Sequence, residues 1–277
     1  MYELILEPGS RARRYWRDLW RYRELFFTLA WRDVSVRYRQ TVVGVAWAVL
    51  QPLVTMIVMT IVFSRVAKLE SEGAAPYALM VIAGMLPWQF FAGSLSAASM
   101  SLLSNAALIS KVYFPRMIIP AASVVTSLVD LLIGFTILLG MMVWFRFLPD
   151  WRIVTLPLFA MLAALVATGL GLFFAALNVK YRDFRYVIPF LVQFGLYISP
   201  VGYSSTLVRE RLGDTAFAAY CLNPMVGVID GFRWAILGGN SELNTLGIAT
   251  AAGIAVLSLM LGVWYFRRAE NKFADII

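Results

Sequence analysis

The chain has 277 residues, of which 61% are apolar and only 14% are charged. A soluble domain is usually about half apolar and about a quarter charged. Here the excess lies in runs of 17 to 29 residues, long enough for a helix to cross a hydrocarbon core of about 30 Å. The composition therefore excludes a soluble globular enzyme, a disordered chain and a disulfide-built secreted module.

Histidine is absent and Cys221 is the single cysteine. The first observation excludes His-dependent chemistry, and the second excludes an intrachain disulfide and a cysteine zinc cluster. The net charge is +8, but in a membrane protein the positions of the cations matter more than their sum. We therefore expect no nucleic acid as a partner.

Residues 1–40 carry nine arginines and no uninterrupted apolar stretch, so they do not resemble a signal peptide. On a helical wheel nine of their apolar and aromatic side chains, from Trp16 to Tyr38, share an arc of roughly 140°. This predicts an amphipathic interface helix in a cytoplasmic arm, with its basic residues toward anionic membrane lipids. The arm is either an ordinary anchor or also part of a docking surface for a cytoplasmic partner. Its expected interface residues are Trp16, Trp20, Phe27, Trp31, Arg37 and Tyr38, of which Arg37 intrudes on the apolar arc.

Residues 41–277 are expected to form one membrane domain. Spans are predicted at about 41–64, 77–100, 117–145, 153–177, 187–203 and 244–266. With six spans, 17 of the 24 lysines and arginines fall on one side and 7 on the other. The positive-inside rule then places both termini in the cytoplasm. The sequence thus predicts an all-α integral membrane protein with six transmembrane helices.

The stretch 204–243 does not fit a seventh span. Asn223 and Pro224 form a turn signal at its middle, and Asp230 and Arg233 follow. Each charge would cost about 2.5–3.5 kcal/mol at the centre of a spanning helix. We therefore expect an outer re-entrant helical hairpin before the last span, in which Asp230 and Arg233 pair with each other or a neighbour, or face water.

Asp130 is the one acid that lies clearly within a predicted span. It is either part of a proton relay or polar pathway, or it hydrogen-bonds a neighbouring helix or a partner subunit and sets packing. Aromatic rings near the spans mostly form interfacial belts, but flat rings also suit the apolar faces of sugars. Candidate pathway residues of that kind are Trp47, Trp88, Tyr197 and Tyr203.

Motifs for catalysis are missing from the sequence. It contains no GxxxxGK[ST] phosphate loop, no serine–histidine pair and no histidine-containing metal motif. We therefore expect no catalytic residues, no metal site and no cofactor bound by this chain.

Several motifs in order along nearly the whole chain resemble the membrane subunit of type-2 ABC exporters that move polysaccharides, such as O-antigen, capsule or teichoic-acid permeases. The most specific is the loop LISKVYFPR at 108–116. Others are WRDVSVRYRQT at 31–41, NVKYRDF at 178–184, SPVGY at 199–203, NPM at 223–225 and ENKFADII at 270–277.

This resemblance implies a bacterial inner-membrane permease that works as a homodimer with two copies of a separate ATPase subunit. ATP and Mg²⁺ would be bound by that ATPase, and a lipid-linked polysaccharide would be the cargo. The hairpin at 204–243 would form an exit gate, with Asn223, Pro224, Asp230 and Arg233 as gate candidates. The expected ATPase-coupling residues are Leu108, Ile109, Lys111, Val112, Tyr113, Phe114, Pro115 and Arg116, with lesser contacts at Lys180, Tyr181, Arg182 and Asp183.

Two other functions remain open at this point. A type-2 exporter of drugs or lipids would share the architecture but not the cargo. A membrane-embedded glycosyl or acyl transferase would be an enzyme, and it would need acid–base groups at the membrane surface.

Overall fold

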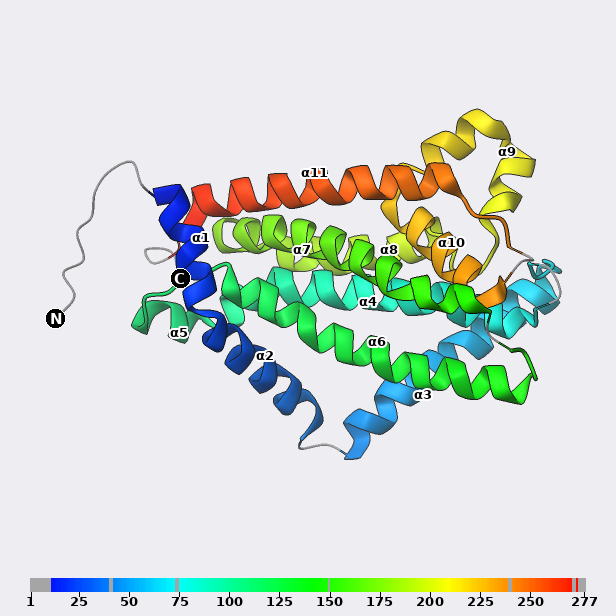
Figure 1. Cartoon of the computed structure of the whole chain (residues 1–277), viewed down its shortest axis with the longest axis horizontal. Coiled ribbons are helices and arrows are strands. Elements are labelled where there is room, and N and C mark those ends of the chain that lie inside the picture. Colours follow the sequence, from blue (N-terminus) through cyan, green and yellow to red (C-terminus); the bar gives the residue numbers. More distant parts are fainter. Residues whose placement is uncertain are drawn as a thin grey trace.

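A computed structural model describes residues 11–39, 42–72, 75–148, 150–238, 241–270 and 273, and these residues form helices and connections without a strand (Figure 1). The elements are α1 (Arg11–Arg21), α2 (Arg23–Tyr38), α3 (Val42–Thr60), the π-helical η1 (Ile61–Val66), α4 (Tyr77–Ser104), α5 (Ala106–Lys111), α6 (Ile118–Trp144), the 3-10 turn η2 (Trp151–Thr155), α7 (Leu156–Lys180), α8 (Phe184–Ile198), α9 (Ser205–Tyr220), α10 (Pro224–Leu237) and α11 (Thr245–Glu270). The all-α prediction is confirmed.

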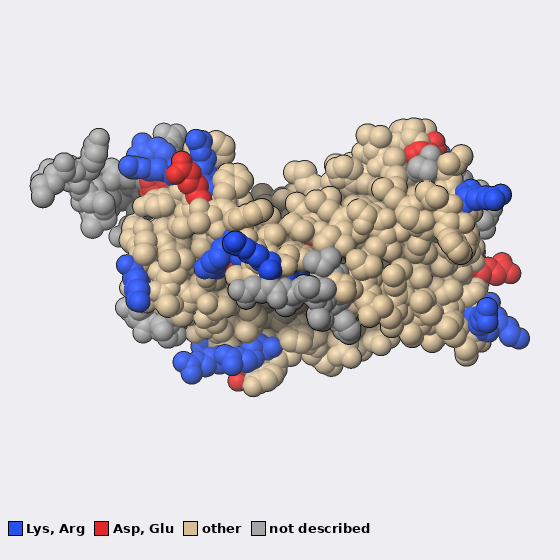
Figure 2. Space-filling model, turned by 90° about the horizontal axis from the view of Figure 1, so that it is seen from below, with Lys and Arg blue, Asp and Glu red and all other residues tan. Residues whose placement is uncertain are grey.

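In the part of the chain that the structure describes, five segments are long and apolar enough to cross a membrane. They are Val49–Val66, Tyr77–Ser104, Ile118–Trp144, Trp151–Lys180 and Thr245–Glu270. They coincide with five of the predicted spans. Figure 2 shows a broad region without charged side chains between the basic groups of the left half and the charged groups at the right end. The protein is therefore an integral membrane protein, as its composition predicts.

The remaining predicted span, 187–203, is shorter than expected. Helix α8 ends at Ile198, because the chain turns at Ser199 and Pro200. Its 15 residues rise about 22 Å, less than the roughly 30 Å of a hydrocarbon core. Five of the six predicted spans are thus long helices, and the fifth in chain order is a short apolar helix.

Helices α9 and α10 meet at 115° across a short break. The side chain of Asn223 accepts a hydrogen bond from the Met225 N–H at 3.1 Å and so caps α10, while Pro224 occupies its first turn. The predicted break at Asn223–Pro224 is confirmed. Both helices lie at the end of the bundle where α11 begins (Figure 1), an arrangement that fits a re-entrant pair.

The two ends of the bundle differ in what they carry. We call the end with α1, α5 and the last turn of α11 the basal end, and the opposite end, with α9 and the start of α11, the distal end (Figure 1). A second, smaller apolar core occupies the basal end and includes Leu29, Ile109, Phe114 and Phe266.

Helix α4 forms the centre of the main core. It packs against α6, α7 and α10, and its residues from Leu79 to Ala83 have no exposed surface. A largely buried helix occupies the axis of the bundle, so one copy of the chain encloses no passage along this axis.

Close approach of α7 and α11 depends on glycine. A β-carbon added at Gly169 would lie 2.5 Å from the backbone of Ser258 and Leu259, and one added at Gly262 would collide with the carbonyl of Gly169. Small residues let spanning helices approach backbone to backbone. Gly227 approaches Gly247 in the same way, so this glycine of α10 also marks a packing contact.

The N-terminal arm consists of two helices, because a turn at Tyr22 separates α1 from α2. Its apolar residues split between two sides: Leu19, Phe26 and Ala30 pack on the second core, while four other aromatic rings point outward. The exposed rings are Trp16, Trp20, Phe27 and Trp31. The arm is thus divided into two helices rather than one, and its role as an amphipathic interface helix stays a prediction.

We predict that Gly262→Val separates α7 from α11 and lowers the free energy of unfolding by about 3 kcal/mol, because the new side chain meets backbone rather than a movable side chain. The measurement is thermal unfolding of the detergent-purified protein. Gly253→Val in the same helix is the matched control, since nothing lies within 4 Å of a β-carbon there. Equal loss of stability in both variants would contradict the packing role of Gly262.

Candidate functional site

The predicted coupling loop lies at the basal end and contains helix α5 (Figure 1). The helix ends at Lys111, and Val112 continues in extended conformation, so the segment 108–116 is helical only in its first part. Lys111, Val112 and Tyr113 are exposed, with 85% of the Tyr113 surface accessible. These three residues form the outward tip of the loop.

Other residues of this loop face inward. Phe114 is only 3% exposed, and Ile109 and Pro115 are also buried. They belong to or adjoin the second core, which means that they hold the loop in place from within. The expectation that Phe114 and Pro115 form part of a docking surface is therefore not supported by their positions, whereas Leu108 is half-buried beside them.

Hydrogen bonds fix the segment 105–116 to neighbouring helices on two sides. The backbone N–H of Arg116 donates to the Glu270 carboxylate at 2.8 Å, and the Arg116 guanidinium donates to the Glu270 carbonyl at 2.5 Å. On the other side, Arg32 of α2 donates to the Asn105 side-chain oxygen at 2.7 Å. The loop, the end of α11 and the arm are thus connected at the basal end.

The second predicted contact loop joins α7 to α8. Lys180, Tyr181, Arg182 and Asp183 are all exposed, and the Lys180 ammonium lies 4.7 Å from the centre of the Tyr181 ring. A cation above a ring is favourable and holds both side chains outward. The loop therefore offers a basic and aromatic surface.

Asp130 lies about three turns into α6 and meets the end of the arm. Its carboxylate forms an ion pair with Arg37 at 2.9 Å and accepts a hydrogen bond from the Tyr38 hydroxyl. Of the two interpretations of Asp130, this geometry favours the contact with a neighbouring helix. The end of α2 therefore lies beside α6 at the level of Asp130.

Arg233 is fully buried in α10 and is surrounded by acceptors. It donates to the carbonyls of Tyr203 at 2.8 Å, Val201 at 3.0 Å and Met80 at 3.4 Å, and it lies 3.4 Å from the Glu72 carboxylate. A guanidinium has five N–H donors in a rigid fork, so it can hold several acceptors at once. We call this group the Arg233 clamp.

Asp230 is also buried, and it accepts a hydrogen bond from the Asn244 side chain at 2.8 Å. The side-chain oxygen of Asn244 in turn accepts from the Gly247 N–H at 2.8 Å, in the first turn of α11. Asp230 thus connects α10 to the start of α11. The prediction that Asp230 and Arg233 have partners is confirmed, and the partners are neighbouring elements.

The aromatic pathway candidates occupy different environments. The Trp88 ring is 5% exposed and fills the space above Gly195, where an added β-carbon would lie 2.6 Å from it. The Trp88 ring therefore packs α4 against α8. The Tyr203 hydroxyl lies 3.1 Å from the Tyr220 hydroxyl, while Tyr197 is exposed on α8. Trp47 belongs to α3, and its side chain lies outside the described part.

Sequence reasoning missed an aromatic stripe on α8. Tyr186, Phe190, Phe194 and Tyr197 are all exposed, and the rings of Phe190 and Phe194 stack with centres 5.8 Å apart. Their spacing of three or four residues places them on one helix face, which is a signal that the sequence contained. Glu72 and Glu270 were missed because nothing in the sequence relates them to Arg233 and Arg116.

Within the described ranges, no group of three or more cysteine, aspartate and glutamate side chains is placed to hold a metal ion. The polar clusters at both ends instead connect helices to one another. These side chains form hydrogen bonds and ion pairs that hold the helices together.

Comparison with known proteins assigns the chain to a family. Residues 24–237 match the family model described as ABC-2 type transporter. The chain is 25% identical over 261 residues to an O-antigen export system permease protein RfbA from Myxococcus xanthus, covering 94% of this chain and 98% of the relative. It is also 25% identical over 255 residues to an RfbA from Klebsiella pneumoniae, covering 92% and 95%. This chain therefore belongs to the ABC-2 type transporter family.

Proposed function

We propose that the chain is the membrane permease subunit of an ATP-driven exporter that moves a lipid-linked, O-antigen-like polysaccharide out of the cytoplasm. The observation that carries this proposal is the similarity to O-antigen export permeases over more than nine-tenths of the chain. The membrane in question would be the bacterial inner membrane, with both termini in the cytoplasm, because the positive-inside count favours that orientation.

The pathway would form between two copies of the chain. Helix α4 fills the axis of a single bundle, so a passage wide enough for a sugar needs a second surface. Exposed apolar side chains on α3, including Leu50, Val54 and Ile57, and the aromatic stripe on α8 are available for that role. Aromatic faces suit the apolar faces of sugar rings, which supports a carbohydrate cargo.

Two copies of a separate ATPase subunit would bind at the basal end and would hold ATP and Mg²⁺. The exposed tip Lys111–Tyr113 and the exposed residues Lys180–Asp183 are the surfaces offered to it. Movement of the tip would reach α11 through Arg116 and Glu270, and the arm through Asn105 and Arg32. The Arg37–Asp130 ion pair would then transmit the movement of the arm to α6.

Loss of the chain tests the function directly. In a strain without it, polysaccharide should disappear from the cell surface and accumulate as a lipid-linked form inside, and a plasmid copy should restore export. Surface and cytoplasmic pools can be compared by immunoblotting. Unchanged surface polysaccharide would favour a drug or lipid exporter, and sugar transfer by the purified chain alone would favour a transferase.

Tyr113→Ala should reduce export at least tenfold, because the ring belongs to the proposed ATPase contact. Membrane insertion and thermal stability should not change, because the ring is exposed and makes no packing contribution to the core. Export and ATP hydrolysis by the complex in proteoliposomes are the measurements. Trp144→Ala, which removes a similarly exposed ring from the end of α6, is the control and should export normally. Normal export by Tyr113→Ala would refute the coupling role of the tip.

Arg37→Ala and Asp130→Asn should each impair export, since each leaves a charged or polar partner in a low-dielectric region. The exchanged pair, Arg37→Asp with Asp130→Arg, should recover at least half of the lost activity because the ion pair is rebuilt. Arg39→Ala changes an adjacent exposed arginine and should have little effect. Additive losses in the exchanged pair would argue against linkage between α2 and α6.

A further inference from the structure

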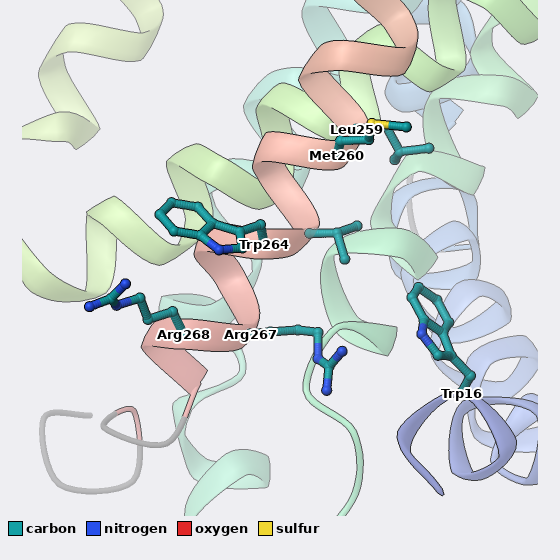
Figure 3. Close-up of a pocket in the computed structure, with 7 residues that line it drawn as sticks. Trp16, Leu259, Met260, Trp264, Arg267 and Arg268 are labelled. Atoms are coloured by element: carbon teal, nitrogen blue, oxygen red, sulfur yellow. The ribbon is translucent and has the colours of Figure 1, made fainter. Parts of the chain in front are cut away.

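A hollow of about 790 Å³ lies on the outer surface of the basal end, between α1 and α11. Trp16 of α1 forms one side, and Met260, Val263, Trp264, Arg267 and Arg268 of α11 form the other. In Figure 3 the Trp16 ring points toward the space beside α11, with Met260 on one side of it along the helix and Arg267 on the other. We call this hollow the α1–α11 groove.

The groove changes character along the helix. Met260, Trp264 and Arg268 follow one another at intervals of four residues, so they form one row on the surface of α11. The row begins apolar, passes an amphipathic ring and ends in a guanidinium. A lipid in the adjacent leaflet has the same order, because its acyl chains lie in the hydrocarbon and its headgroup lies at the membrane surface.

The charged end of the groove carries two guanidinium groups, each of which lies near an aromatic ring. The Arg267 guanidinium lies 4.8 Å from the centre of the Tyr15 ring, and that of Arg268 lies 5.8 Å from the centre of the Trp264 ring. Glu270 offsets part of the Arg267 charge, but its carboxylate accepts the Arg116 N–H. Arg268 is exposed and forms no ion pair with any residue that the structure describes.

We propose that the α1–α11 groove binds an anionic phospholipid of the adjacent leaflet, with its phosphate at Arg267 and Arg268 and an acyl chain along Val263 and Met260. Charge complementarity selects the headgroup, since basic pockets beside spanning helices bind anionic headgroups. The bound lipid contacts both α1 and α11, so it fastens the first helix of the arm to the bundle. This inference does not depend on the cargo of the exporter.

The full-length protein, purified in a neutral detergent, is titrated with phosphatidylglycerol and with phosphatidylcholine of the same acyl chains, and the first binding event is followed by native mass spectrometry. Phosphatidylglycerol should bind more tightly. Arg268→Ala should weaken its binding about fivefold, and Arg267→Ala with Arg268→Ala about thirtyfold, which corresponds to about 1 kcal/mol for each arginine. Binding of phosphatidylcholine should not change.

Matched variants separate this groove from general surface charge. Arg268→Lys should keep most of the affinity, because the charge remains. Arg185→Ala removes an exposed arginine from the start of α8 and should leave binding unchanged. Because Arg267 contacts Tyr15, the double variant can also disturb the fold, and the single Arg268→Ala variant then carries the test.

Three results would overturn the proposal. Equal affinity for the two lipids would exclude headgroup selection by the arginines. Unchanged phosphatidylglycerol binding in Arg268→Ala would place the lipid elsewhere. Displacement of phosphatidylglycerol by an equimolar polyprenyl diphosphate would assign the groove to the carrier lipid of the cargo.

Discussion

Charged groups inside a membrane protein need partners, because hydrocarbon offers neither water nor counterions. Asp130 and Arg233 satisfy this constraint in different ways. Asp130 draws the end of the arm onto α6 through Arg37 and Tyr38. Arg233 gathers backbone carbonyls of α4 and of the connection between α8 and α9. Each charge therefore decides which segments lie together, one near the arm and one near the distal end.

The Arg233 clamp also explains how irregular backbone persists at the distal end. The turn after α8 leaves carbonyl groups without helical partners, and non-helical backbone at membrane depth survives only where protein or water satisfies it. The Arg233 guanidinium donates hydrogen bonds to the carbonyls of Val201 and Tyr203, and the Tyr77 hydroxyl donates to the carbonyl of Gly202. The Arg233 clamp thus connects this segment to α10.

The basal end carries the proposed ATPase-contact surfaces. An exposed tip projects from α5, and the residues behind it are anchored in the second core. Hydrogen bonds join the same loop to α2 and α11. A force applied at the tip would therefore be shared by the arm and the last span rather than absorbed by a loose loop.

The amino-acid sequence by itself determined the fold class, the five long spans and the break at Asn223–Pro224. The reason is that the length of an apolar run and the effect of a proline on the backbone are local properties of the chain. Its motifs also indicated the exporter family. Only the tertiary structure decided that Phe114 faces inward, that Tyr22 divides the arm and that Arg37 pairs with Asp130. Those outcomes depend on which helices pack together, and residues far apart in sequence carry no local signal of that choice.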